Sequence, residues 1–433
     1  MNKFMDWMEA HVMPLAGKLG TNRYLKAISS GFIAIMAATI VGSIFTLIGN
    51  LPITAWTDWL ASTGLNKILA LPGQCTTDLI ALYAVFFIGY NLAETFDVDG
   101  KGAGLACLVS FFVVTGRATY FAAAAEDAAA VSALSTGFLG AKGLFTAMIV
   151  ALLGARIYVF VVQKGWVIKL PDSVPPNVAG SFNALIPSFF VVIVFLLVAM
   201  GMSFTSYGDL HTMIFTVIQS NLMKFMGDNI WSFLFFNFMT NILWFFGLHG
   251  GNIVGSITNP IYTPLSLENL AAYEAGEKVM PYIINGNFSK CFTFGGVGSM
   301  FGLAILMCFF AKSAQYKTLG KLSLPTTFFF INEPLLFGIP VVLNPMFFLP
   351  LMFTTPILGS LTYVVMKIGL IPIPHGLQLP WTMPPVINGF LQGGVMLALW
   401  EFLMVLASIA IWYPFFKMGD KKALEEEKGT VTE

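Results

Sequence analysis

Long apolar runs separated by short polar segments make up most of this chain. Nine of these runs could form helices across a lipid bilayer: residues 27–48, 78–93, 103–114, 143–162, 185–204, 230–246, 295–311, 345–366 and 390–416. A helix needs about 20 apolar residues to cross the hydrocarbon core of a membrane. The pattern therefore predicts an all-α integral membrane protein.

Basic residues predict how the spans are oriented. They flank both ends of the apolar region in two groups, Lys18, Arg23 and Lys26, then Lys417, Lys421 and Lys422. Positively charged residues next to spans remain on the cytoplasmic side, so both termini are expected there. This requires an even number of crossings, and a further one must lie within 247–294 or 322–345. The expected total is about ten transmembrane helices.

Amphipathic stretches predict two further helices on the membrane surface. Apolar residues recur at helical spacing near the N-terminus, at Phe4, Met8, Val12, Leu15 and Leu19. Residues 205–228 resemble a second such helix. The polar, proline-rich link 164–184 is interpreted as a cytoplasmic connection between two bundles. We expect two membrane halves, residues 1–208 and 209–433.

Two segments interrupt the helical pattern at membrane depth. Residues 247–265 contain several glycines and Pro260, and residues 328–345 contain Pro334, Pro340 and Pro345. A straight helix does not tolerate prolines this dense. Irregular backbone inside a membrane is stable only where protein buries it or where it lines a wet cavity. Interrupted spans in a transporter indicate its substrate site.

Glu333 is the strongest candidate for chemistry, because it stands in the apolar stretch FFFINEPLLFGIP. A charged residue at the centre of a membrane helix costs roughly 2.5–3.5 kcal/mol on insertion scales, and such residues usually line a polar cavity. Pro334 disfavours helical backbone at Glu333 and itself suits the first position of a helix. We expect Glu333 at a helix N-cap with Asn332 just before it. A purely structural cap is the alternative.

His249 is the second candidate, at the end of a long apolar run and before Gly250 and Gly251. The glycines leave room for a ligand near the backbone, and Asn252 adds an amide. A lone histidine is more often a hydrogen-bonded core residue. Together with Glu333 on another broken segment, however, it forms a pair that can orient and deprotonate a hydroxyl group.

Trp244 and Trp381 are candidates for sugar binding. Trp244 precedes His249 by about one and a half helical turns, and Trp381 stands in the proline-rich stretch LPWTMPP. Flat aromatic rings stack on the C–H faces of sugars, although tryptophan also anchors spans at membrane interfaces.

Composition excludes several other classes of protein. Hydrophobic residues make up 57% of the chain and charged residues only 10%, and the net charge is zero. A soluble domain carries roughly 25% charged residues, and nothing indicates a nucleic-acid partner. The four cysteines are scattered without metal-binding spacing. No Walker A, GxGxxG or zinc pattern is present, so no cofactor or metal is expected.

Four segments of the chain resemble one known family. FFGLHGGN at 245–252 and INEPLLFGIPVVLNP at 331–345 are similar to the signature segments of phosphotransferase-system enzyme IIC, in the lactose/cellobiose/N,N'-diacetylchitobiose group. LGAKGLF at 139–145 and KLPDSVPPNVAGSFNALIP at 169–187 also resemble that group. The resemblance extends along essentially the whole chain.

The resemblance implies a homodimer of ten-helix protomers in a bacterial cell membrane. The first half would form the dimer, and the second would bind the sugar with re-entrant hairpins near 247–265 and 328–345. A disaccharide of the cellobiose or chitobiose type would be carried inward and phosphorylated at its 6-hydroxyl group. The donor would be a phosphocysteine on a separate IIB protein, supplied in turn by IIA. Glu333 and His249 would hold the hydroxyl group.

Two other functions remain open from the residues alone. An ion-coupled secondary sugar transporter also has broken helices and a membrane-embedded acid, and Glu333 would then carry a proton. A membrane-embedded transferase without transport is the other alternative.

Overall fold

The computed structural model describes residues 14, 18, 21–50, 54–115, 118–121, 130–134, 136–168, 170–171, 173–339 and 341–430. The surface helix predicted near the N-terminus falls mostly outside these residues. The described chain is helical apart from a two-stranded antiparallel ribbon, β1 (Ala118–Phe121) and β2 (Ala130–Ala133). It forms two compact units that divide at residues 224 and 225, and residues 50–55 belong with the second.

The N-terminal unit comprises residues 21–49 and 56–224. Its α-helices are α2 (Arg23–Gly49), α3 (Thr54–Thr63), α4 (Leu65–Thr76), α5 (Ile80–Glu94), α6 (Gly100–Thr115), α7 (Leu144–Gln163), α8 (Pro176–Asn183), α9 (Leu185–Ser203), α10 (Leu210–Ile214) and α11 (Ser220–Leu222). Short 3-10 turns are η1 (Thr77–Leu79), η2 (Thr136–Phe138) and η3 (Ala141–Gly143), and π-helical turns are η4 (Phe215–Gln219) and η5 (Met223–Gly227).

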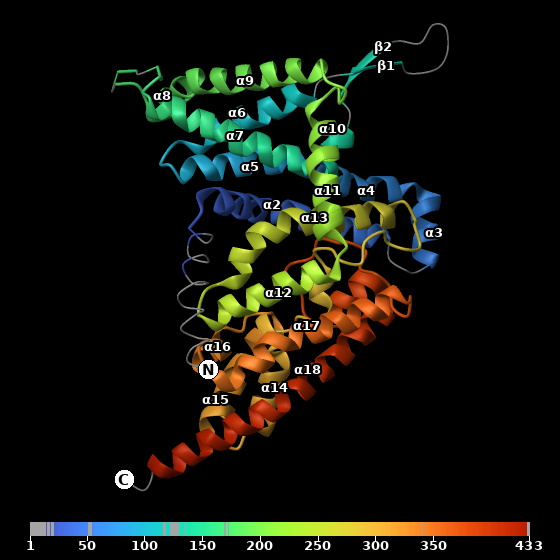
Figure 1. Ribbon diagram of the computed structural model, residues 1–433. Coiled ribbons are helices and arrows are strands. Elements are labelled where there is room, and N and C mark those ends of the chain that lie inside the picture. The colour runs from blue at the N-terminus through green and yellow to red at the C-terminus, as the bar shows by residue number, and fades with distance from the viewer. Residues whose placement is uncertain are drawn as a thin grey trace. The chain divides into compact units, whose positions relative to one another are not determined.

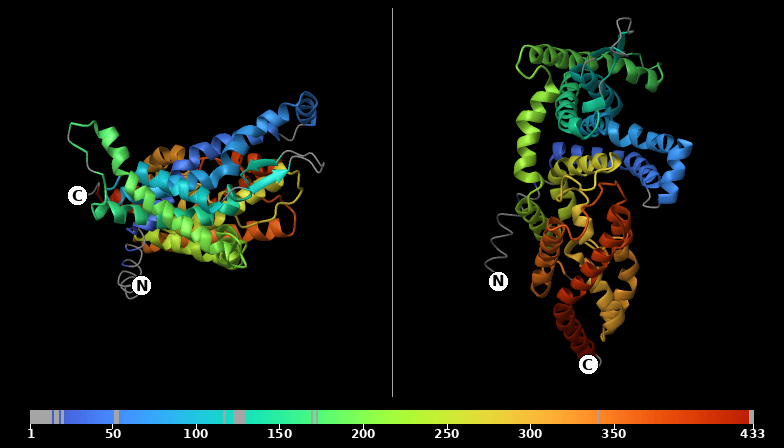
Figure 2. Two further views of the ribbon diagram at one scale, coloured as in Figure 1. Left: turned by 90° about the horizontal axis from the view of Figure 1, so that it is seen from above. Right: turned by 90° about the vertical axis from the view of Figure 1, so that its right-hand side faces the viewer.

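Helix α5 is the centre of this unit and packs against α2, α6 and α7 (Figures 1 and 2). Small residues bring these helices close together. A Cβ atom at Gly31 of α2 would lie 2.5 Å from Ile88 of α5, and one at Gly89 would lie 2.9 Å from Cys107 of α6. Close contact at small residues is the usual way in which helices pack in a membrane.

The C-terminal unit contains the segments that carry the candidate site. Its α-helices are α12 (Ile230–Phe245), α13 (Gly250–Glu274), α14 (Phe301–Phe310), α15 (Ala314–Phe328), α16 (Glu333–Gly338), α17 (Pro345–Lys367) and α18 (Ile387–Thr430). Two 3-10 turns, η6 (Phe288–Cys291) and η7 (Val297–Ser299), precede α14. Helix α18 is interrupted at Gly393 and Gly394, whose backbone angles are not helical.

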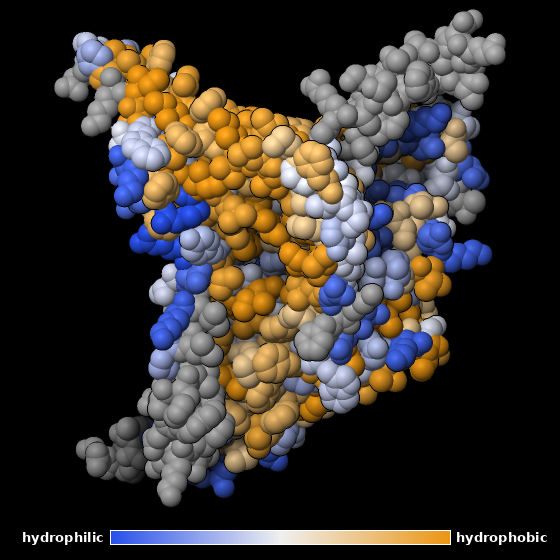
Figure 3. Space-filling model, turned by 45° about the horizontal axis from the view of Figure 1, so that its top comes forward, coloured by the Kyte–Doolittle hydropathy of each residue, from blue (hydrophilic) through white to orange (hydrophobic). Residues whose placement is uncertain are grey.

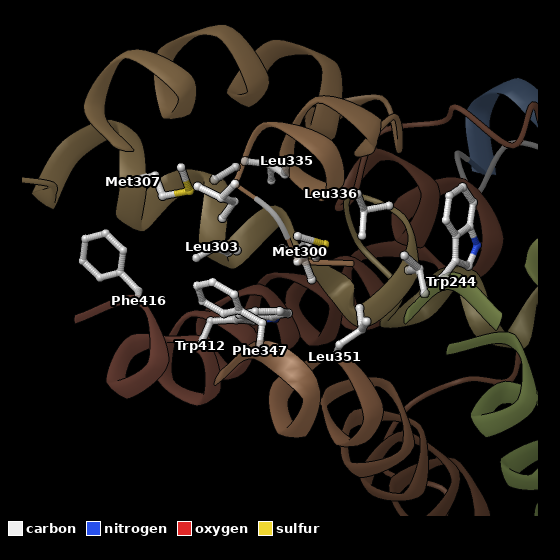
Figure 4. Close-up of a cluster of buried hydrophobic side chains, with 14 of the residues drawn as sticks. Trp244, Met300, Leu303, Met307, Leu335, Leu336, Phe347, Leu351, Trp412 and Phe416 are labelled. Carbon is white, nitrogen blue, oxygen red and sulfur yellow. The ribbon is translucent and has the colours of Figure 1, made fainter. Parts of the chain in front are cut away.

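One large hydrophobic cluster forms the core of this unit (Figure 4). It joins Trp244 at the end of α12, Leu335 and Leu336 of α16, and Trp412 of α18. The Trp412 indole also donates a hydrogen bond of 3.0 Å to the Gly298 carbonyl. The core therefore packs directly against the ends of both broken segments.

The helices have the character of membrane spans. Among the described residues, six helices are long and apolar enough to cross a bilayer, and three shorter apolar helices accompany them. A helix covers most of each of the nine predicted runs. Broad hydrophobic areas cover the face drawn in Figure 3, which is the surface expected of a protein surrounded by lipid tails.

The two predicted interruptions differ in extent. Between Phe328 and Pro345 only the short helix α16 forms, as expected of that proline-rich segment. The other break is confined to residues 246–249, and the prediction of a break through residue 265 is wrong. Helix α13 continues for 25 residues through Pro260 and Pro264. A proline in a helix leaves a backbone carbonyl group without its N–H donor. At membrane depth, neighbouring helices, side chains or ordered water can supply the missing hydrogen bond.

Candidate functional site

The break between α12 and α13 positions His249. After Phe245 the chain turns through Gly247, which has a φ of 76°, and His249 then caps α13. The His249 Nδ1 atom accepts a hydrogen bond of 3.1 Å from the Asn252 backbone N–H. A neutral imidazole that accepts at Nδ1 carries its proton on Nε2. The exposed ring of His249 therefore offers an N–H donor to a ligand.

Glycine is required just after this histidine. A Cβ atom at Gly250 would collide with the carbonyl oxygen of Thr240 on α12. The first turn of α13 therefore lies directly on α12. Gly251 and Asn252 are exposed beside His249, so the chain at these two residues is accessible from outside.

Trp244 lies behind His249 and is mostly buried. The ring centroids of Trp244 and His249 are 4.4 Å apart, with an angle of 49° between the planes. Only 7% of Trp244 is exposed, and its ring belongs to the core cluster. The indole therefore supports the imidazole and leaves little surface for stacking on a sugar.

The second broken segment positions Asn332 and Glu333. Asn332 is the N-cap residue of α16, and Glu333 is the first helical residue. The prediction that Glu333 itself occupies the N-cap is wrong by one residue, because the Asn332 carbonyl already accepts hydrogen bonds from Leu335 N and Leu336 N, each 3.0 Å long. Glu333 still lies at a helix N-terminus, where the helix dipole stabilises a carboxylate.

The Asn332 side chain ties α16 to the turn before α14. Its Nδ2 atom donates to the Val297 carbonyl at 3.1 Å and lies 3.4 Å from the Met300 sulfur. The residue is only 3% exposed. Nearby, Gly296 has a φ of 80°, and a Cβ atom there would lie 2.7 Å from the Asn332 amide. Asn332 thus fixes the position from which Glu333 projects.

The carboxylate of Glu333 has an unusual environment. Its Oε2 atom is buried and has no hydrogen-bond partner among the described residues. Leaving a buried acceptor unsatisfied costs about 1–3 kcal/mol, and more for a charged group. Such an atom is ready to accept a hydrogen bond from a ligand.

A backbone hydrogen bond and a shared hydrophobic cluster connect the two broken segments. The Leu343 N–H, just after α16, donates a hydrogen bond of 2.9 Å to the carbonyl of Phe245 at the end of α12. Trp244 and Leu336 belong to the same core cluster, as Figure 4 shows. The segments that carry His249 and Glu333 are therefore fixed to each other.

Trp381 lies on a separate loop between α17 and α18. The Met383 N–H donates to the Pro380 carbonyl at 3.0 Å, so that Trp381 occupies a tight turn. The side chain is 51% exposed, which leaves its ring open to a ligand. The described contacts do not join Trp381 to His249 or Glu333.

Comparisons with known proteins identify the family of this chain. The family model "Phosphotransferase system, EIIC" matches residues 29–355. The chain belongs to this family. It is a multi-pass membrane permease component of the phosphotransferase system, and EIIC components work with IIB and IIA partners.

Relatives match the chain over nearly its whole length. The lichenan permease IIC component of Bacillus subtilis (strain 168) is 36% identical over 434 residues, which is 99% of this chain and 96% of that protein. A cellobiose-specific EIIC component of Geobacillus stearothermophilus is 35% identical over 442 residues, covering 100% of this chain and 98% of that one.

A solved structure shares the fold. The crystal structure of ChbC, the IIC component of an N,N'-diacetylchitobiose-specific phosphotransferase system, matches with a TM-score of 0.92 and 35% sequence identity. The match covers 98% of this chain and 99% of ChbC.

Two charged residues of this EIIC chain were not singled out from the sequence. Lys290 in η6 donates from Nζ to the Leu379 carbonyl at 3.2 Å. Glu401 of α18 is fully buried and accepts from Val386 N at 2.6 Å and from Asn388 Nδ2 at 2.7 Å. Both hold the loop that carries Trp381. Glu401 interrupts an apolar run as Glu333 does, so the sequence contained the signal.

The two main residues of the candidate site differ in the hydrogen bonds that they can make. His249 presents a donor, because its Nδ1 acceptor is already used by Asn252. Glu333 presents an acceptor without a partner in the described structure. A carboxylate of this kind can take the proton of a hydroxyl group while a neighbouring N–H holds an oxygen in place.

Proposed function

We propose that this EIIC protein binds a disaccharide of the cellobiose or chitobiose type, carries it inward and presents its 6-hydroxyl group to phosphorylated IIB. The observation that carries the proposal is the buried Oε2 atom of Glu333, which lacks a hydrogen-bond partner among the described residues. A sugar hydroxyl group supplies the missing donor. The lichenan, cellobiose and chitobiose names of the relatives support the substrate class.

In the proposed reaction, Glu333 acts as the general base. The 6-hydroxyl proton moves to the Glu333 carboxylate while the hydroxyl oxygen forms a bond to phosphorus. The bond between phosphorus and the cysteine sulfur of IIB breaks, and a thiolate leaves. Alignment and charge stabilisation supply most of the catalysis in phosphoryl transfer. The His249 Nε2–H donor holds the sugar or phosphoryl oxygen in line.

The remaining predicted residues have supporting roles in the proposed site. Trp381 stacks on a sugar ring, because its indole is half exposed, while Trp244 keeps the His249 ring in place. Asn252 is exposed at the start of α13 and offers its amide to the sugar, and the buried Gly250 lets this turn lie against α12. Asn332 contributes to substrate binding indirectly, because its side-chain hydrogen bond fixes the position of Glu333.

The membrane arrangement that accompanies this function is also a proposal. It has ten crossings, re-entrant hairpins at the two broken segments, and both termini in the cytoplasm. The N-terminal half forms a homodimer, and the C-terminal half carries the sugar. The basic residues that flank the spans support the orientation.

A proton-coupled sugar transporter is the second candidate. The same observation favours it, since an unpartnered carboxylate beside a broken helix could bind and release a proton. The two functions differ in what drives sugar accumulation.

The substitution Glu333→Gln tests the proposed reaction. It keeps the size of the side chain but removes the base, so phosphorylation of labelled cellobiose by purified phospho-IIB should fall by at least about 100-fold. Cellobiose binding, measured by calorimetry, should weaken much less. The exposed Glu277 provides the control, and Glu277→Gln should transfer phosphate like the parent. Full phosphotransfer by Glu333→Gln would refute the assignment.

A further inference from the structure

The loop of residues 374–386, between α17 and α18, is built to hold one exposed aromatic ring. Its tight turn from Pro380 to Met383 is closed by a backbone hydrogen bond of 3.0 Å. Trp381 lies inside this turn and is 51% exposed. A large ring at such a tip must be held by the segments on either side if it is to keep one orientation.

Polar side chains hold the part of the loop before Trp381. The Leu377 carbonyl accepts hydrogen bonds from Asn287 Nδ2 at 3.2 Å and from Gln392 Nε2 at 2.7 Å. The Lys290 ammonium donates to the Leu379 carbonyl at 3.2 Å. Asn287 and Gln392 are almost completely buried, so these bonds are shielded from water and hold the backbone firmly.

A single carboxylate holds the part after Trp381. Glu401 of α18 is 0% exposed, and its two oxygens accept from Val386 N at 2.6 Å and from Asn388 Nδ2 at 2.7 Å. No ion pair found among the described residues involves Glu401. Burying a carboxylate in an apolar helix is costly. Here both carboxylate oxygens accept hydrogen bonds from the short segment 386–388.

The backbone that Glu401 holds is strained and closely packed. Val386 has a φ of 70°, a left-handed conformation that β-branched residues rarely adopt. The chain reverses at Gly393 and Gly394, which places residue 389 against the part of α18 that follows this break. A Cβ atom at Gly389 would lie 2.8 Å from the Glu401 carboxyl carbon. The short bond of 2.6 Å to the Val386 N–H therefore maintains a conformation that the residue does not favour.

We propose that Glu401 is a positioning residue for sugar recognition, which fixes the Trp381 turn through Val386 and Asn388. The inference rests on the proposed function, in which Trp381 stacks on the sugar. Glu401 does not touch the sugar. Its effect should therefore fall on binding and leave the phosphotransfer step, which Glu333 carries out, unchanged.

The test compares Glu401→Leu with the parent in phosphotransfer from purified phospho-IIB to cellobiose. Leucine has a similar size and offers no acceptor, so both bonds to Val386 and Asn388 are lost and the turn loosens. We expect KM to rise by about tenfold, the order of one lost aromatic contact, with kcat almost unchanged. Quenching of the Trp381 signal by acrylamide, taken as the difference between each protein and its Trp381→Phe version, should increase.

A second substitution tests the hydrogen bonds directly. In the double variant Glu401→Gln/Asn388→Asp the carboxylate and the amide exchange places. The carboxylate now at position 388 would accept from the amide N–H now at position 401, and the amide oxygen at position 401 would accept from Val386 N. This double variant should restore most of the KM and the quenching of the parent. Failure of the exchange to restore either one would overturn the positioning role.

The outcomes separate this inference from the proposed function. If Trp381→Ala raises KM and Glu401→Leu does not, the positioning role is wrong and the proposed function stands. If Trp381→Ala leaves KM unchanged, the proposed stacking fails and the inference fails with it. Should Glu401→Leu not fold, Asn388→Ala removes one of the two bonds. It must raise KM without changing kcat, and an unchanged KM contradicts the proposal.

Discussion

The two nitrogens of His249 have separate tasks, and substitutions can separate them. Nδ1 caps α13 by accepting from Asn252 N, and Nε2–H is the proposed donor to the substrate. Asparagine is also a good N-cap residue, so His249→Asn should keep the stability of the parent and lose about 100-fold in phosphotransfer. His249→Ala should lose the activity and also roughly 0.5–2 kcal/mol of stability. Phosphotransfer and thermal unfolding of the purified variants are the measurements.

The result that would contradict this division is specific. If His249→Asn transfers phosphate like the parent, the Nε2–H donor has no part in the reaction. If it unfolds as easily as His249→Ala, the cap explanation is wrong. Trp244, 4.4 Å from the imidazole, is unchanged in both variants and so cannot account for a difference between them.

At the scale of elements, α10 is held to the N-terminal unit by a buried histidine. The His211 ring lies 2.9 Å from Thr115 Oγ1, stacks on Phe138 at 4.7 Å and is only 2% exposed. Burial lowers the pKa of His211 to about 4, although Asp209 opposes the shift. Helix α10 lies outside the candidate spans.

The His211 ring stays neutral in the folded state, and this determines whether stability rises or falls with pH. Below about pH 6.5 the unfolded chain takes up a proton and the folded one does not, so stability should fall by about 1.4 kcal/mol per pH unit as the pH decreases towards 4. Thermal unfolding between pH 7 and pH 4 measures this slope. His211→Gln should reduce it. Thr115→Val removes the hydrogen bond but no titrating group and should keep the slope, and an unchanged slope in His211→Gln would contradict the explanation.

The sequence predicts an element well when residues within that element determine it, and poorly when residues distant in the chain do. The apolar runs of α2, α7, α9 and α17 give their bounds to within a few residues, because each run decides its own helix. The break at His249 and the unusual position of Glu333 are also local signals. Helix α13 passes through Pro260 because of its surroundings in three dimensions, and the partners of Lys290 are distant in the chain. Such long-range contacts leave no pattern in the sequence.

For the whole molecule, the source of the energy for sugar accumulation decides between the two proposed functions. A phosphorylated sugar carries charge that the membrane interior strongly disfavours, so phosphorylation on the inner side traps it. Right-side-out vesicles loaded with phospho-IIB should accumulate labelled cellobiose as the sugar phosphate, and a protonophore should not reduce this. Vesicles with Glu333→Gln should bind the sugar and accumulate none. Accumulation of free sugar that a protonophore abolishes would show that Glu333 carries a proton and would reject the phosphotransfer role.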